Sequence, residues 1–287
     1  MVLSRRLKAA FLTRSSDHLM TSWISGTCRA NEISIHYLRT GGNKPPLIAL
    51  HGLIGSGACW TPVVRCLEDD YDVVMPDARG HGQSSAPPHG YLYQDLAKDV
   101  VGLIAGLGLA NPVILGHSMG GMTAAVAACQ LGAAIRAVIL ADPTFISPER
   151  QREVYESNVL EHHRQLLKSS KDALLADLRF RHPHRSSELL ECMADARLAT
   201  KVGAFEVLTP PNPDYRELVC HIRAPIFLVT GENGVVSIEI AKDLQTLNHR
   251  LRHEQMPGAG HALPYDQPES LAVAVQSFLG SIITSRQ

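Results

Sequence analysis

The stretch PVILGHSMGGMTAAVAACQLG (residues 112–132) most constrains the fold of this chain. A short apolar run ends at a G-x-S-x-G pattern, Gly116 to Gly120, and a helix pattern of small residues follows. A strand that turns abruptly into a helix brings backbone segments close together, so residues without side chains are needed on both sides of the turn. The serine at its centre, Ser118, then lies at the end of a sheet, with a helix N-terminus beneath it. The stretch therefore predicts a nucleophile elbow in an α/β protein.

Other parts of the sequence repeat the alternation of strand and helix. Short apolar runs bounded by Gly, Pro or Asp recur as EISIHYL, PLIALHG, DVVMPD, AVILADP and IFLVTGE. Between them lie helix patterns such as residues 93–109, where Leu96, Val100, Leu103 and Leu107 recur at three- and four-residue spacing. Alternating buried strands and amphipathic helices predict an α/β fold, with a mostly parallel sheet covered by helices on both faces.

The alternation stops between Ser147 and His221, where the sequence is charged and rich in Leu and Ala and lacks buried-strand runs. Three amphipathic helix patterns fill this segment. We therefore expect a helical cap, or lid, at residues 147–221, inserted into an α/β core of residues 23–146 and 222–287. A lid inserted between two strands is expected to cover the strand ends, where open α/β sheets bind ligands.

The N-terminal stretch and the composition restrict the class of protein further. Residues 1–19 are basic and contain no acid before Asp17, as in a weak targeting peptide, but we favour a disordered extension (1–22) or an upstream start codon. The net charge of −1 predicts neither a nucleic-acid nor a membrane partner. The six cysteines lack paired spacing, which favours reduced thiols in the cytoplasm and no metal site. The oligomeric state stays open, with a homodimer as one outcome.

A histidine near the C-terminus supplies a candidate base for Ser118. His261 lies in MPGAGHALPYDQP, in a loop that leaves the last strand and precedes an apolar helix pattern. A base on such a loop can reach the serine hydroxyl at the strand ends. The pairs at His162-His163 and His182-x-His184 lie in a charged region without the carboxylate or cysteine neighbours of a metal site.

At this point the chain resembles the α/β-hydrolase fold family, in its lid-bearing esterase, lactonase and epoxide-hydrolase-like branch. The order serine, then histidine near the C-terminus, agrees with that family, as does the His51-Gly52 pair after a strand. The resemblance covers about residues 34–280 and implies that the backbone amides of Leu53 and Met119 form an oxyanion hole. A further family pattern, D-x-R-G-x-G-x-S, is interpreted as a structural turn; it comprises Asp77, Arg79, Gly80, Gly82 and Ser84.

Residues beside these motifs are expected to border the substrate. They are His51, Gly52, Trp60 and His117. The sequence RFRHPHR (179–185) could also offer Arg179, Arg181 or Arg185 to a substrate carboxylate, although a solvated turn is the more common outcome for such a segment. No cofactor is expected, because acyl transfer by a serine, a histidine and backbone amides needs none.

The acid of a Ser-His-Asp triad is missing from its usual place. In most of the family the Asp follows the strand IFLVTGE at the position that Gly234 occupies here. Asp142, in VILADPTF, follows the next strand after the nucleophile helix, 24 residues beyond Ser118, and neighbouring strand ends converge on one crevice. Some relatives in the fold take their acid from this place, among them haloalkane dehalogenases, zearalenone lactonases and 2-(acetamidomethylene)succinate hydrolase.

We therefore predict Asp142 as the triad acid, with Glu232 as the alternative and Asp243 and Asp266 behind it. An Asp before a proline is also a common turn former, which is the competing explanation for Asp142. If Asp142 is the acid, the loop with Asn233 and Gly234 becomes a wall of the pocket.

Three functions remain open from the sequence. The first is a serine hydrolase that cleaves an ester, lactone or activated amide of a small molecule through an acyl-enzyme. The second is a cofactor-independent carbon–carbon hydrolase or oxygenase, in which His261 deprotonates the substrate and Ser118 positions it. The third is a non-catalytic small-molecule receptor. The elbow, the oxyanion loop and the base together favour the first.

Overall fold

The centre of the computed structural model, which describes residues 23–284, is an eight-stranded sheet in the order β1-β2-β4-β3-β5-β6-β7-β8. The predicted extension at residues 1–22 lies outside the described residues. β2 runs antiparallel to both of its neighbours, and all other neighbouring strands are parallel. The strands are β1 (Ile24–Ala30), β2 (Ile33–Arg39), β3 (Pro46–Leu50), β4 (Asp72–Pro76), β5 (Val113–His117), β6 (Ala137–Ala141), β7 (Ile226–Asn233) and β8 (Leu251–Gly260).

The central strands are apolar throughout because both of their faces are covered. Every residue of β5 is buried, and its side chains alternate between two hydrophobic clusters. Ile114 packs in the cluster with α3 and α4, whereas Val113 and Leu115 pack in the cluster with α2 and α12. The same division explains why the sequence shows unbroken apolar runs in place of an alternating pattern.

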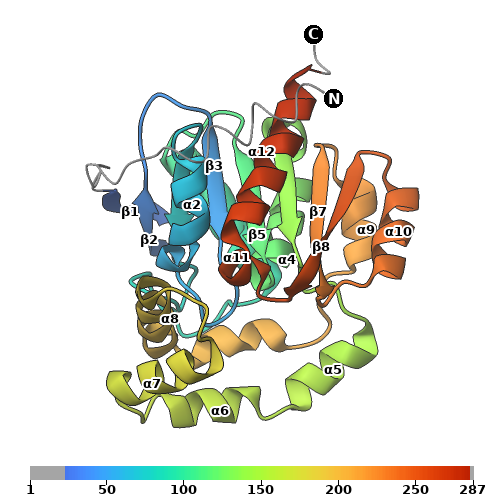
Figure 1. The fold of residues 1–287 in the computed structure, drawn as a ribbon. Helices are drawn as coiled ribbons and strands as arrows, with labels where there is room; N and C mark the ends of the chain where they lie inside the picture. The colour runs from blue at the N-terminus through green and yellow to red at the C-terminus, as the bar shows by residue number, and fades with distance from the viewer. Residues whose placement is uncertain (1–22, 285–287) are drawn as a thin grey trace.

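Helices cover the sheet on both faces, with α2 and α12 on one side and α3 and α4 on the other (Figure 1). These observations confirm the predicted α/β fold class. None of the described helices combines the length and the apolar character that crossing a bilayer requires. The helices of this part are η1 (Gly57–Trp60), α2 (Thr61–Leu67), α3 (Tyr93–Gly106), α4 (Met119–Leu131), η2 (Gly132–Ala134), α10 (Ile238–Leu247), α11 (Leu263–Asp266) and α12 (Pro268–Thr284).

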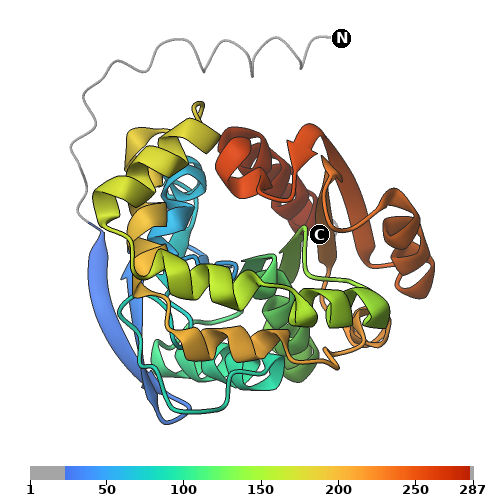
Figure 2. The same ribbon diagram turned by 90° about the horizontal axis from the view of Figure 1, so that it is seen from below.

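Between β6 and β7 the chain forms a run of helices beyond the carboxyl ends of the parallel strands (Figure 1). Seen from below, these helices surround one side of the strand ends (Figure 2). A third hydrophobic cluster holds α7 and α8 together and includes Cys59 of η1. We call α5 to η3 the cap. Its helices are α5 (Pro148–Glu156), α6 (Val159–Leu166), α7 (Lys171–Arg181), α8 (Ser187–Ala199) and η3 (Val202–Leu208).

The segment between β6 and β7 differs in detail from the predicted insertion at 147–221. α9 (Tyr215–His221) packs against α4 and α10 and so covers the sheet with them. Its Tyr215 ring stacks on Phe145, with ring centroids 5.0 Å apart. The helix pattern that begins at Pro148 is also interrupted at Ser157, so that α5 and α6 are separate helices. The first difference arises from the tertiary packing of α9. The second arises from a short break in the helix that no Gly or Pro marks in the sequence.

The turn that follows β4 is held by buried ionic groups. The Asp77 carboxylate accepts hydrogen bonds from the amides of Gly57 (2.8 Å) and Gln83 (2.9 Å). Arg79 forms a bidentate pair with Asp99, with both N···O distances at 2.6 Å and both side chains buried. Since all of these contacts are internal to the protein, they match the structural interpretation of the D-x-R-G-x-G-x-S turn.

Candidate active site

Ser118 stands at the sharp turn between β5 and α4. Its backbone has φ 55° and ψ −120°, a conformation that residues with a side chain rarely adopt. The flanking glycines make this turn possible: a Cβ on Gly116 would lie 2.1 Å from the carbonyl oxygen of Gly120, and one on Gly120 would lie 2.3 Å from that of Leu50. The strained turn projects Ser118 from the end of the sheet at the N-terminus of α4.

His261 links the serine to a carboxylate. Its Nε2 lies 2.9 Å from Oγ of Ser118, and its Nδ1 lies 2.6 Å from Oδ2 of Asp142. A carboxylate oxygen only accepts, so Nδ1 carries the proton of the neutral ring and Nε2 accepts from the serine hydroxyl. The side chain of Asp142 is 0% exposed and that of His261 is 39% exposed. The acid is therefore shielded from water while the base remains open to a ligand.

Asp142 is held by the loop that follows β7. Oδ2 accepts a hydrogen bond from the amide of Val235 (2.8 Å), and Oδ1 accepts one from the amide of Val236 (3.1 Å). The residue has a positive φ of 42°, which Asp tolerates better than most residues. The carboxylate of Asp142 thus accepts hydrogen bonds from two backbone amides and from the imidazole of His261. These three contacts fix its orientation behind His261.

Gly234 makes room for this carboxylate. A Cβ at position 234 would lie 2.6 Å from Oδ1 and 2.8 Å from Oδ2 of Asp142. Any side chain at position 234 would therefore collide with the carboxylate of Asp142. Gly234 occupies the position where most of the family carries its acid. The absence of a side chain there and the presence of Asp142 after β6 therefore depend on each other sterically.

The other carboxylates proposed from the sequence lie in other contacts. Glu232 is exposed, and its Oε2 accepts a hydrogen bond from the amide of Gly258 (2.8 Å). Asp266 pairs with Arg185 at 2.8 Å, and Asp243 pairs with Arg216. Glu232 thus stabilises the segment before His261 through the amide of Gly258. The carboxylate that contacts the imidazole of His261 is that of Asp142.

Two buried histidines support the loop that carries Leu53. Nδ1–H of His51 donates to the carbonyl of Gly52 (2.7 Å), and its Nε2 accepts from the amide of Ala78 (3.0 Å). Nε2 of His81 accepts from the amide of Ile54 (3.3 Å). Burial lowers the pKa of His51, and burial with the neighbouring His51 lowers the pKa of His81 to about 3. Both rings therefore stay neutral and keep an acceptor nitrogen for these amides.

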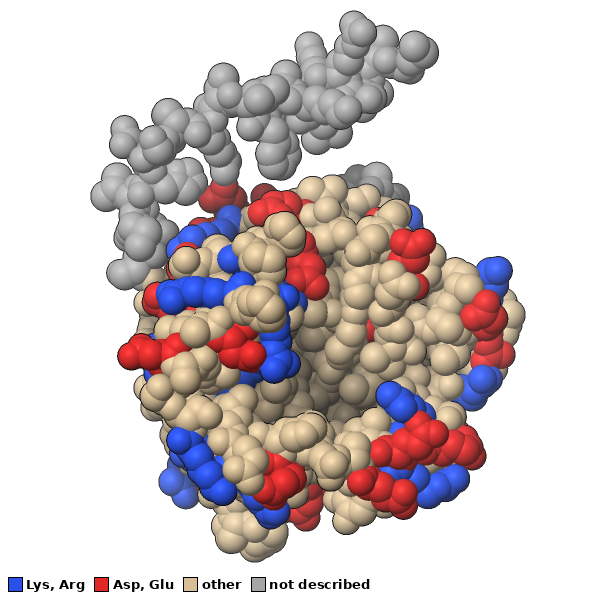
Figure 3. Space-filling model, turned by 60° about the horizontal axis from the view of Figure 1, so that its bottom comes forward, with Lys and Arg blue, Asp and Glu red and all other residues tan. Residues whose placement is uncertain are grey.

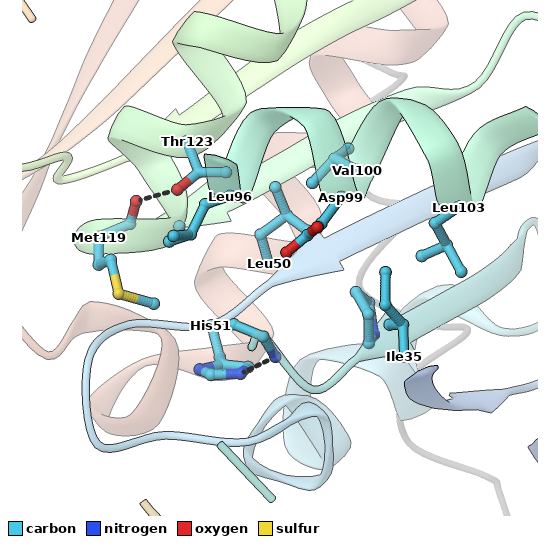
Figure 4. Close-up of a pocket in the computed structure, with 12 residues that line it drawn as sticks. Ile35, Leu50, His51, Leu96, Asp99, Val100, Leu103, Met119 and Thr123 are labelled. Atoms are coloured by element: carbon cyan, nitrogen blue, oxygen red, sulfur yellow. Dashed lines mark hydrogen bonds between the residues drawn. The ribbon is translucent and has the colours of Figure 1, made fainter. Parts of the chain in front are cut away.

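Within residues 23–284, the backbone amides of Leu53 and Met119 donate to no other protein group, as the predicted oxyanion hole requires. Behind them lies a small apolar cavity bordered by β3, α3 and α4 (Figure 4). The Met119 side chain lines this cavity, and the Thr123 hydroxyl donates to the carbonyl of Met119 (2.9 Å). The side chain of Met119 is thus anchored inside the protein, which fixes the first residue of α4.

The residues expected to border the substrate divide into two groups. Gly52 lies against the nucleophile, since a Cβ there would be 3.2 Å from Cβ of Ser118. His117 and Trp60 are buried. Trp60, only 1% exposed, packs in the cluster of α2 and α12, so its predicted contact with a substrate is replaced by a role in the core. His51, whose ring nitrogens are both engaged, supports the loop in the same way.

His117 positions the base from below. Its Nε2–H donates to the backbone carbonyl of His261 at 2.7 Å, and the two rings lie 4.9 Å apart. Burial and the nearby His261 lower the pKa of His117 to about 4, so the ring is neutral at pH 7. Its Nδ1 is buried without a hydrogen-bond partner in the described part of the chain. A neutral ring at this place puts no positive charge beside His261.

A larger pocket lies between the cap and the loop that follows β7. Its volume is about 380 Å³, within the range of small-molecule sites. It extends from α5 to the loop after β7, where it reaches Gly234 and Val235, and the amide of Val235 donates to Asp142. Its walls include Tyr93, Thr144, Gln151, Leu208 and Asn212. These residues come from three distant segments, and no sequence pattern indicated that they line one pocket.

A serine, a histidine and a buried aspartate joined in this order at the ends of parallel strands are the arrangement of serine hydrolases. Comparison with known proteins gives the family and the broader class of hydrolases. The chain belongs to the α/β-hydrolase fold family, whose model matches residues 45–268. Its relatives are named as hydrolases, which identifies the protein as a hydrolase.

Two relatives match nearly the whole chain. It is 26% identical to 2-(acetamidomethylene)succinate hydrolase of Mesorhizobium japonicum, covering 92% of this chain and 97% of the relative. It is 28% identical to N-formylmaleamate deformylase of Pseudomonas putida, covering 91% and 98%. The crystal structure of an E-2-(acetamidomethylene)succinate hydrolase superposes with a TM-score of 0.76 at 23% identity, covering 90% of this chain and 99% of the other, which shows the shared fold.

Proposed function

We propose that this protein is a serine hydrolase that cleaves an ester, lactone or activated amide of a small molecule through an acyl-enzyme. The observation that carries the proposal is the continuous relay from Ser118 Oγ to His261 Nε2 (2.9 Å) and from His261 Nδ1 to Asp142 (2.6 Å). Two relatives that match over nine tenths of this chain are named for substrates with an N-formyl or an acetamido group, which supports including activated amides.

In the proposed reaction, Ser118 Oγ attacks the carbonyl carbon of the substrate while His261 Nε2 takes the hydroxyl proton. The carboxylate of Asp142 stabilises the imidazolium that forms and keeps the ring in the required tautomer. The amides of Leu53 and Met119 donate to the oxyanion of the tetrahedral intermediate. When the intermediate collapses, the leaving group takes the proton from Nε2 and departs.

The second half of the reaction repeats these roles with water. His261 removes a proton from water, the hydroxide attacks the acyl carbon, and the same two amides hold the oxyanion. Collapse breaks the bond to Ser118 Oγ, which recovers its proton from His261 and releases the carboxylic acid. The 39% exposure of His261 supports this step because water must reach Nε2.

The test is turnover of short acyl esters, lactones and N-acyl amides by the wild type and by Ser118→Ala. An acyl-transfer enzyme loses nearly all activity in the variant, and a fluorophosphonate labels Ser118 of the wild type. Substantial turnover by Ser118→Ala would instead indicate proton abstraction by His261, as in a carbon–carbon hydrolase or an oxygenase. A folded protein that neither reacts with the probe nor turns over any substrate would be a receptor.

A further inference from the structure

Arg197 lies on the inner face of the cap helix α8. Leu190, Met193 and Ala194 are buried on this helix, and position 197 follows them at spacings of seven, four and three residues. Residues at these spacings share one side of a helix, so the stem of Arg197 lies along the buried side. Arg185 reaches the same side, since its Nη1 lies 3.4 Å from Sδ of Met193. Two arginines therefore meet between the cap and the core.

The two arginines differ in their partners. Arg185, whose side chain is 6% exposed, is paired with Asp266 at 2.8 Å. Within the described residues, Arg197 has no carboxylate at ion-pair distance and no hydrogen-bond partner. The nearby Asp177 is paired with Arg181 at 2.8 Å. Since both acids are neutralised by other arginines, the guanidinium of Arg197 leaves one uncompensated positive charge here. Burial, followed by the proximity of Arg185, lowers the pKa of Arg197.

Tyr265 connects these arginines to the triad. Its ring lies 5.6 Å from the ring of His117, which in turn lies 4.9 Å from the ring of His261. The guanidinium of Arg185 lies over the same tyrosine ring at 5.5 Å, and Tyr265 packs against the apolar cluster of α7 and α8. Burial raises the pKa of Tyr265, with smaller opposing effects from Arg185 and Arg197. Its hydroxyl therefore keeps its proton. Among residues 23–284 this hydroxyl has no hydrogen-bond partner.

The free phenol of Tyr265 thus lies two ring contacts from the candidate base, and the uncompensated guanidinium of Arg197 is close enough to Tyr265 to influence its pKa. Figure 3 shows that the face where the cap meets the strand ends is hollowed, with Lys or Arg side chains along one wall of the hollow. Leaving a partly buried cation unpaired is unfavourable, so such a group is retained where a ligand supplies the countercharge. A carboxylate fits best, because its two oxygens match the planar fork of a guanidinium.

We propose that Arg197 and the Tyr265 hydroxyl bind a carboxylate of the substrate, so that the enzyme selects anionic acyl compounds. This inference rests on the proposed hydrolase function and adds the substrate class. The paired Arg185 lies over the tyrosine ring at 5.5 Å and helps to hold the ring in place. The scissile carbonyl lies at Ser118 while the carboxylate lies on the far side of Tyr265, against the cap.

The experiment compares mono(4-nitrophenyl) esters of C4 to C6 dicarboxylic acids with their neutral methyl esters. The wild type is expected to prefer the anionic ester in kcat/KM. In Arg197→Gln the ratio of anionic to neutral kcat/KM falls by about 10- to 100-fold, mainly through KM, because a charged hydrogen-bond pair is lost. Arg197→Lys keeps the charge without the fork and gives an intermediate ratio. Arg164→Gln, an exposed cap arginine paired with Glu161, is the matched control and leaves the ratio unchanged.

A binding measurement separates this inference from the proposed function. Calorimetry with Ser118→Ala compares two ligands: the mono-anilides of the same acids, which are anionic, and the methyl esters of these anilides, which are neutral. One outcome is that no ester is hydrolysed, that the anionic anilide binds at least tenfold tighter than its methyl ester, and that Arg197→Gln in this background removes the difference. The carboxylate site is then supported and the hydrolase function is not. If the esters are hydrolysed but neither their ratio nor anilide binding responds to Arg197→Gln or Tyr265→Phe, the carboxylate site is wrong and the hydrolase stands.

Discussion

Gly234→Ala tests whether the empty space at position 234 is required by Asp142. The added methyl group would lie 2.6 Å from Oδ1 and 2.8 Å from Oδ2 of the carboxylate. To reach ordinary contact, the carboxylate or the loop must shift by about 0.5–1 Å. Such a shift lengthens the 2.6 Å contact between Asp142 and Nδ1 of His261 or breaks the bonds to the Val235 and Val236 amides.

The expected loss follows from this displacement. A misplacement of about 1 Å in a catalytic array costs on the order of 10²-fold in rate, so Gly234→Ala is expected to lower kcat by about 10- to 100-fold. Removal of the carboxylate is more severe, at about 10³- to 10⁴-fold, because the imidazole loses both its tautomer control and its counterion. The alanine variant should therefore fall between the wild type and Asp142→Ala.

The assay is a double-mutant cycle measured with an activated ester. Gly234→Ala is made in the wild type and in Asp142→Ala, and kcat is determined for all four proteins after circular dichroism shows that each is folded. Once the carboxylate is absent, the methyl group at 234 has nothing to displace, so it should change the residual rate by less than about threefold. Wild-type turnover in Gly234→Ala, or an equal loss in both backgrounds, would refute the steric dependence between these positions.

Three further predictions concern the parts of the fold that hold the site. Trp60→Ala should lower the free energy of unfolding by about 3–5 kcal/mol in urea titrations while the KM of the folded fraction stays within twofold, since this side chain fills the core. Gly116→Ala should yield insoluble or unfolded protein on expression, because a Cβ would lie 2.1 Å from a backbone oxygen; a soluble, active variant would contradict the close approach. For His81, with a pKa of about 3 in the folded state, the unfolded chain binds more protons below its ordinary pKa near 6.5. The free energy of unfolding should therefore fall as pH drops from about 6.5 toward 4, with a flatter pH dependence in His81→Gln.

Much of the fold follows from local patterns in the sequence. The unbroken apolar runs identified the central strands because both faces of a parallel sheet are buried. The order strand, glycine, serine, glycine, helix located Ser118. Glycines are required there because the carbonyl of Gly120 lies close to Gly116 and the carbonyl of Leu50 lies close to Gly120. Tertiary packing decided the rest: α9 joins α4 and α10 by contacts that no helical periodicity reveals.

The candidate site was harder to predict where residues from distant segments meet. The missing acid at Gly234 pointed to Asp142, but the amides that hold it, those of Val235 and Val236, lie more than 90 residues away along the chain. Arg197 and Tyr265 gave no sequence signal, because their proximity depends on how the cap packs on α11, the short helix after β8. Of the arginines in residues 179–185, Arg185 contacts the ring of Tyr265, and the binding of a carboxylate in this region stays a prediction.

The central claim is that Asp142 activates Ser118 through His261, and the rate of fluorophosphonate labelling tests it most directly. The measurement is the second-order rate constant for a single adduct at Ser118, located by peptide mass spectrometry, in the wild type, Asp142→Asn and Glu232→Gln. The relay predicts that Asp142→Asn slows labelling by about 10³-fold or more and that Glu232→Gln stays within about threefold of the wild type. A wild type without an adduct at Ser118, or a Glu232→Gln variant slower than Asp142→Asn, would contradict it.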